Sequence, residues 1–240
     1  MAERFGQRGV ADTAGEGMSL VTESGALQHK VMVAVPSGTM VHASFAQDLA
    51  LLLSYTTYVK PDMEVTLAFV KGTYLPRARA SLVQYAEERG STHILWLDAD
   101  MRFPKDTLLR LLDHHVSIVA ANYPTRQPPI LPTVVDVDRN MVFAVEGLQE
   151  VQWCGMGVML TDMAVFRAIG KPYFALGYSR VDDDYSGEDT FFCDRARKEG
   201  FPIFIDGPLS EAVLHLGEFS YGMPHARMTQ EAAHGANKQD

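Results

Sequence analysis

Two aspartates, Asp98 and Asp100, directly follow the apolar run Ile94 to Leu97. Side chains alternate along a strand, so residues two apart point the same way. Two carboxylates would therefore project together from the end of a buried strand, where open α/β sheets place their ligands. Adjacent like charges need a compensating cation, and hard divalent ions prefer oxygen ligands. The pattern predicts a divalent-cation site, and the alternative is that both aspartates only cap the helix expected near Pro104.

A second acidic pair, Glu188 and Asp189, stands at the start of a predicted helix over residues 187–200. The positive end of a helix favours anions, so an acidic residue there is often only a cap. The functional interpretation is a general base that takes the proton from an attacking hydroxyl. Both interpretations remain open from the residues alone.

A third candidate is His215, which lies in the apolar run Ala212 to Leu216. A lone histidine in such a run is commonly a core residue. A neutral imidazole can also complete an oxygen-rich metal site. The run follows the last predicted strand, so the chain could return here to the edge of the sheet that carries the aspartates.

Short continuous apolar runs and apolar residues at helical spacing indicate the elements that must position these residues. Strands are predicted at 31–35, 65–70, 94–97, 116–121 and 203–205, and helices at 42–58, 75–89, 104–114, 162–169 and 187–200. The alternation of predicted strands and helices along the chain favours an α/β domain over residues 29–222. We also expect an inserted antiparallel hairpin that pairs 133–137 with 142–146, a flexible arm at 1–28 and a polar tail at 223–240.

Composition sets further bounds on the 240-residue chain. It is 47% apolar and 21% charged, which is ordinary for a globular protein and excludes a wholly disordered or collagen-like chain. The net charge of −9 argues against a surface generally adapted to nucleic acid. Cys154 and Cys193 are too far apart in sequence for a zinc knuckle. With no apolar run near the ~18 residues that span a bilayer, we expect a cytoplasmic protein without a membrane partner.

In six ordered segments the chain resembles the glycosyltransferases of the GT-A fold, near their family-2-like and mannosyltransferase-type members. The segments are VAVPSG, LPRARASLVQYA, ILWLDADMRFP, WCGMGVML, GEDTFFCDRARKEG and VLHLG. The resemblance spans about residues 30–222 and is that of a compact, soluble bacterial or phage enzyme. It implies a mostly parallel central sheet flanked by helices, and metal-dependent transfer of a sugar from a UDP- or GDP-sugar to an acceptor hydroxyl.

The resemblance also implies roles for single residues. Asp100 and His215 would ligate Mn²⁺ or Mg²⁺, and Asp98 would contact this ion or the ribose. Asp189, with Glu188 beside it, would be the base. The donor would be contacted by the remaining matched positions, which are Pro36, Ser37, Arg77, Arg79, Trp153 and Gly155.

The acceptor stays open among a hydroxymethylated DNA base, a glycan and a protein side chain, and the stereochemistry stays open between inversion and retention. Two other functions are weighed. A catalytically silent nucleotide-sugar-binding domain would need the aspartates of the central motif but not Asp189. A nucleotidyltransferase is less favoured, because its loop after the first strand would carry a lysine, whereas Pro36 to Thr39 has none.

Overall fold

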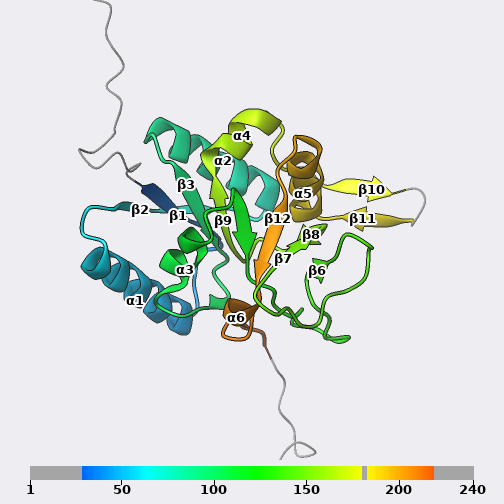
Figure 1. Cartoon of the computed structure of the whole chain (residues 1–240), viewed down its shortest axis with the longest axis horizontal. Helices are drawn as coiled ribbons and strands as arrows, with labels where there is room; N and C mark the ends of the chain where they lie inside the picture. The colour runs from blue at the N-terminus through cyan, green and yellow to red at the C-terminus, as the bar shows by residue number, and fades with distance from the viewer. Residues whose placement is uncertain (1–28, 180–182, 219–240) are drawn as a thin grey trace, which may run out of the picture.

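The computed structural model describes residues 29–179 and 183–218, so the predicted arm at 1–28 and tail at 223–240 lie outside the described residues (Figure 1). Seven strands form one sheet in the order β2-β1-β3-β9-β5-β12-β7. Their bounds are β1 Lys30–Ser37, β2 Glu64–Lys71, β3 His93–Leu97, β5 Ile118–Ala120, β7 Leu148–Val151, β9 Val158–Asp162 and β12 Ile203–Asp206. Strands β9 and β7 run against the other five. The predicted mixed, mostly parallel α/β fold is confirmed.

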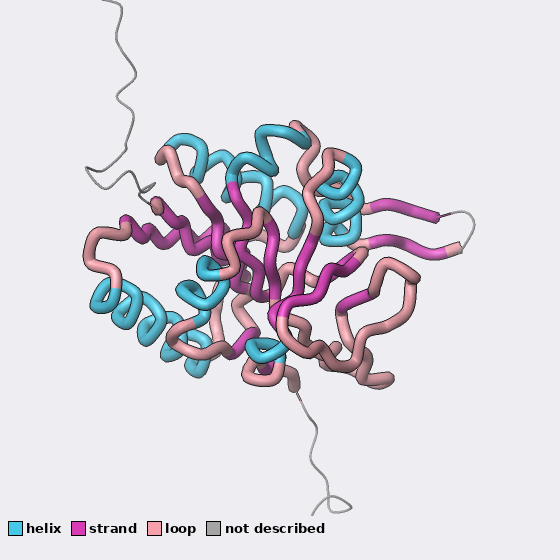
Figure 2. Tube along the Cα trace, in the orientation of Figure 1, coloured by secondary structure: helices cyan, strands magenta, loops and turns pink. Residues whose placement is uncertain are grey.

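Helices cover both faces of this sheet, as Figures 1 and 2 show. Their bounds are α1 Ala43–Val59, α2 Leu75–Glu88, α3 Thr107–Asp113, α4 Met163–Ile169, α5 Glu188–Lys198 and α6 Gly207–Ser210. Met32 and Ala34 of β1 pack in the cluster that includes side chains of α2, α4 and α5. Val31 and Val33 pack on the opposite face, with α1, α3 and α6. Burial on both faces explains why the β1 sequence is a continuous apolar run rather than an alternating one.

Three short antiparallel pairs lie outside the main sheet. They are β4 Met101–Arg102 with β13 Leu214–His215, β6 Val134–Val135 with β8 Trp153–Cys154, and β10 Gly177–Ser179 with β11 Asp184–Ser186. The first pair joins the segment after β3 to the last described part of the chain. It therefore brings together two regions that carry predicted site residues.

The predicted hairpin of 133–137 with 142–146 forms only in part. Its turn is present, because the Asp136 amide donates to the Asn140 carbonyl at 2.9 Å and the Asp136 side chain accepts from the Asn140 amide at 2.8 Å. The second arm is not a strand. Val134 and Val135 pair with β8, and toward the predicted arm they make only a bridge from Val135 to Met141 and a hydrogen bond from the Val142 amide to the Val134 carbonyl. The alternating pattern was compatible with a strand, but its main partner lies farther along the sequence.

Candidate functional site

A cleft of about 500 Å³ opens where β1 and β3 leave the sheet at their carboxyl ends. The loops after β1 and β2, the turn after β3 and two later segments form its walls. The lining residues are Pro36, Ser37, Gly38, Met40, His42, Gly72, Thr73, Leu75, Asp98, Ala99, Asp100, Arg126 and His215. Pro36, Ser37, Asp98, Asp100 and His215, all predicted from sequence, thus surround one cavity. This is the edge at which open α/β sheets bind ligands.

Strand β13 explains how His215 reaches the aspartates. In its antiparallel pairing with β4, His215 lies opposite Met101, and the Leu216 amide donates to the Asp100 carbonyl at 2.7 Å. His215 Nε2 lies 3.4 Å from Asp100 Oδ2. The other ring nitrogen, Nδ1, lies 2.9 Å from the Pro124 carbonyl oxygen, which can accept a hydrogen bond from it. That bond leaves Nε2 directed at the carboxylate.

The charges at Asp100 favour its ionised form. Partial burial alone would raise the pKa of Asp100, but its hydrogen bond to His215 and the charges of His215 and Arg126 outweigh burial and lower it. The same hydrogen bond raises the pKa of His215 against the opposing effect of burial. Arg126 Nη1 forms an ion pair with Asp100 Oδ2, the oxygen that faces His215. Arg126 was not among the residues singled out from the sequence.

The metal site can be tested against this geometry. Asp100 and His215 supply one carboxylate and one imidazole. No group of three His, Cys, Asp or Glu side chains is arranged to hold a metal ion within residues 29–179 and 183–218. Two side chains are too few for a complete site, so an ion held here would take its other ligands from phosphate oxygens and water, as Mg²⁺ does in nucleotide sites.

Asp98 has a different partner from Asp100. Its two carboxylate oxygens lie 3.0 and 3.2 Å from Arg79 Nη2. Asp98 continues the parity of Trp96, which faces the side of the sheet covered by α2, but β3 ends at Leu97 and a turn at residues 99–100 follows, so the predicted common direction of the two aspartates is not kept. Asp98 still forms part of the cleft wall, and burial raises its pKa more than Arg79 lowers it.

Arg79 is an internal counter-ion in the structure. Its side chain is only 2% exposed, and besides Asp98 it contacts Glu188, with Nε 3.2 Å from Oε1. The guanidinium also lies over the Trp96 ring, 5.7 Å from the centroid. The predicted contact between Arg79 and the donor does not fit this position, because two carboxylates and burial hold the group below the cleft. Arg77 is exposed and does not line the cleft either.

The acidic pair at the start of α5 divides into two environments. Glu188 is buried and pairs with Arg79. Asp189 is half-buried, and its Oδ1 accepts from the Thr190 amide at 2.8 Å. A Cβ atom on Gly187 would lie 2.4 Å from that oxygen, so glycine gives this carboxylate its space. The charge of Asp189 contributes to the raised pKa of Asp98, which places the two carboxylates within electrostatic reach.

The segment predicted to shape the sugar pocket encloses Tyr123. Cβ atoms on Gly155 and Gly157 would lie 2.3 and 2.8 Å from Tyr123 side-chain atoms. The Gly157 amide donates to the phenol oxygen at 2.9 Å, and the ring meets His215 edge-on with 5.3 Å between centroids. Burial and the Asp98 charge raise the pKa of Tyr123 well above its usual value. Two glycines separated by one residue beside an apolar strand could have signalled this close approach.

Trp153 lies on the α5 side of the site. Its Nε1 donates to Asp194 Oδ1 at 2.6 Å, and the Arg139 guanidinium lies 5.1 Å from the ring centroid. It is not among the residues that line the cleft. No direct contact between Trp153 and the cleft therefore supports its predicted role in the sugar pocket.

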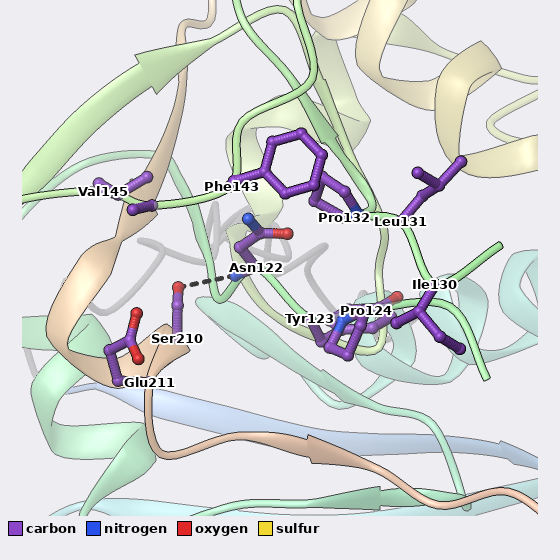
Figure 3. Close-up of a pocket in the computed structure, with 11 residues that line it drawn as sticks. Asn122, Tyr123, Pro124, Ile130, Leu131, Pro132, Phe143, Val145, Ser210 and Glu211 are labelled. Carbon is purple, nitrogen blue, oxygen red and sulfur yellow. Dashed lines mark hydrogen bonds between the residues drawn. The ribbon is translucent and has the colours of Figure 1, made fainter. Parts of the chain in front are cut away.

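A second cavity, of about 250 Å³, shares Pro124 with the region around His215 (Figure 3). Its wall is mostly apolar and includes Ile130, Leu131 and Phe143. The Asn122 amide nitrogen of the backbone donates to Ser210 Oγ at 2.8 Å, as drawn in Figure 3. The cavity thus lies on the α6 side of the segment that supplies Tyr123.

Comparison with known proteins supports the fold. No protein-family model and no curated protein sequence matches the chain. The crystal structure of A197 from STIV is similar, with a TM-score of 0.51 and 13% identity over 80% of this chain and 97% of A197. The structure of S. aureus TarS 1–349 has a TM-score of 0.48 and 14% identity over 78% of this chain, which spans 60% of that one. The first likeness shows a shared α/β fold, and the second is too distant to add to it.

Within the part of the chain that the structure describes, no helix combines the length and apolar character needed to cross a membrane.

Proposed function

We propose that this protein is a glycosyltransferase that moves a sugar from a nucleotide-sugar donor to an acceptor hydroxyl, with Mn²⁺ or Mg²⁺ bound at Asp100 and His215. The observation that carries the proposal is the cleft itself. Pro36 and Ser37 at the end of β1, the aspartates after β3 and His215 on β13 come from three distant segments and line one cavity. The sequence resemblance to GT-A enzymes supports the same assignment.

In the proposed reaction, the bond between the anomeric carbon and the donor diphosphate breaks as the acceptor oxygen attacks. The bound ion would supply positive charge to the diphosphate as it leaves. Asp100 and His215 would hold that ion, and the hydrogen bond from His215 to Pro124 keeps the imidazole oriented. The loop at Pro36 and Ser37 would contact the nucleotide from the opposite wall of the cleft.

Asp189 is the proposed base. An acceptor hydroxyl is a weak nucleophile near neutral pH and gains from a carboxylate that accepts its proton. Glu188 is less suited to this role, because Arg79 already holds its carboxylate. Arg79 is instead a positioning residue, since it ties the start of α5 to Asp98 and so fixes where Asp189 lies relative to the cleft.

The test is an assay of the full chain with a panel of UDP- and GDP-sugars, Mn²⁺ or Mg²⁺, and glycan, protein and hydroxymethylated-DNA acceptors. We expect release of the nucleoside diphosphate with one donor, lost on addition of EDTA and in Asp100→Asn. Asp189→Asn should lower kcat by about a hundredfold or more, the usual contribution of general base catalysis, with little change in donor affinity. Arg77→Gln, on the exposed side of α2, is the matched control.

Three results would contradict the proposal. Unchanged activity in Asp100→Asn would exclude the metal role assigned to it. Donor binding without turnover on any acceptor, together with no effect of Asp189→Asn, would favour the silent binding domain. Pyrophosphate release from a nucleoside triphosphate would favour a nucleotidyltransferase.

A further inference from the structure

Arg126 occupies a distinctive place at the cleft. It lies in the loop after β5, and its side chain is 50% exposed. It lines both the main cleft and an adjoining cavity of about 320 Å³ formed with His42, Gln127 and residues 216–218. Among the described residues that line the cleft, Arg126 is the one with a permanent positive charge. Arg79, the cation expected from sequence, is buried behind the aspartates.

Arg126 is paired with Asp100, one of the two side chains proposed to hold the metal ion. Arg126 Nη1 contacts Asp100 Oδ2, and His215 Nε2 lies 3.4 Å from that oxygen. A divalent cation bound between Asp100 and His215 would place two positive charges within contact distance of the guanidinium. A cation on Asp100 would therefore weaken the pairing of Arg126 with Oδ2, because like charges at this separation repel.

We propose that Arg126 and the divalent cation compete for Asp100, and that Arg126, once displaced, binds the diphosphate of the nucleotide donor. This inference rests on the proposed function. A diphosphate offers adjacent anionic oxygens, which match the planar fork of a guanidinium. The anion would lie beside the cation on Asp100, so the released side chain needs to move only within the cleft that it already lines. A Cβ atom on Gly217 would lie 3.1 Å from the Arg126 Cβ, so the base of the Arg126 side chain lies against the segment that follows β13.

This arrangement predicts opposite effects from one substitution. Arg126→Gln removes the competitor for Asp100, so Mn²⁺ should bind about two- to fivefold more tightly in the absence of nucleotide, the range expected for a partly exposed ion pair. With Mn²⁺ saturating, the same variant should bind UDP or GDP about tenfold or more weakly, because it lacks a charge-assisted hydrogen bond to phosphate. UMP and GMP, which lack the second phosphate, should lose less affinity.

The measurements are Mn²⁺ titration followed by electron paramagnetic resonance of the free ion, and calorimetric titration of the nucleotides, on the full chain. Arg126→Lys keeps the charge but not the fork, so its Mn²⁺ affinity should stay near that of the unsubstituted protein while its diphosphate affinity falls. Arg77→Gln, exposed and outside the cleft lining, should change neither constant. Circular dichroism verifies that each variant is folded.

Two failures are distinguishable. If the unsubstituted protein binds neither Mn²⁺ nor UDP nor GDP, the proposed function is wrong and this inference falls with it. If it binds both ion and nucleotide, yet Arg126→Gln leaves either constant unchanged or weakens Mn²⁺ binding, only the role given to Arg126 is overturned.

Discussion

The buried guanidinium of Arg79 permits a quantitative test of the site. Arg79→Met keeps the length and apolar volume of the side chain but removes its charge. Asp98 and Glu188 then remain with 26% and 12% of their side chains exposed and without their shared cation. Removing one partner of a buried ion pair costs about 3–5 kcal/mol. The partial exposure of Asp98 favours the lower end, so we expect a loss of about 3 kcal/mol in the free energy of unfolding.

The loss should depend on pH, and its sign follows from Asp98. Burial already raises the pKa of Asp98, with Arg79 opposing this effect. Without Arg79 the pKa rises further, and the folded state binds more protons than the unfolded chain between the ordinary aspartate pKa of 3.8 and this raised value. Stability then falls as pH increases through that window. Arg79→Met should therefore be more destabilised near pH 7 than near pH 5.

Urea denaturation in EDTA, followed by circular dichroism at both pH values, measures these differences. Arg77→Met on the exposed side of the same helix should change stability by no more than about 0.5 kcal/mol. Adding Asp98→Asn to Arg79→Met should recover part of the loss, since it removes one of the unpaired charges. A loss below about 1 kcal/mol for Arg79→Met, equal at both pH values, would refute the ion-pair assignment.

Three further outcomes are expected from single contacts. Gly155→Ala should cost about 1–3 kcal/mol in stability, because its Cβ would meet the Tyr123 hydroxyl at 2.3 Å. This cost should be smaller in a Tyr123→Phe background. Thermal unfolding measures both, with Gly38→Ala as the control, since nothing lies within 4 Å of a Cβ there. Tyr123→Phe alone should cost about 1–3 kcal/mol in a urea titration, since it leaves the buried Gly157 amide unpaired; no change would exclude that hydrogen bond. Burial lowers the pKa of His93 below 6.5, so the free energy of unfolding should fall as pH drops below that value. In His93→Gln the urea midpoint should change less between about pH 7.5 and pH 5 than in the unsubstituted protein.

The central elements could be predicted because their residues form clear apolar patterns. Val31 to Val35 and Ile94 to Leu97 are continuous apolar runs, and both became strands buried on two faces. The helix predicted at 187–200 appears as Glu188–Lys198. Because nearly every residue of such a segment is buried, the segment is visible in the sequence as a local run of apolar residues.

The fine structure of the site depends on contacts between distant segments. Strands of two residues, such as Leu214–His215, carry no detectable period, yet this one brings His215 to Asp100. Sequence alone could not distinguish an arginine that faces a ligand from Arg79, which is buried between two carboxylates. Arg126 lies in a loop with no pattern of its own, and its partner is 26 residues away.

The reversed direction of β9 has a consequence for how this site could be altered. Because β9 runs against β3 and β5, its first residues, not its last, meet the edge of the sheet where Asp98 leaves; the Gly157 carbonyl accepts from the Asp98 amide there at 2.9 Å. An added residue just before Val158 would shift the glycines that enclose Tyr123. The end of β9 at Asp162 lies at the opposite rim, where Asp162 caps α4 directly, so a change at that junction would leave the rim that carries the cleft in place.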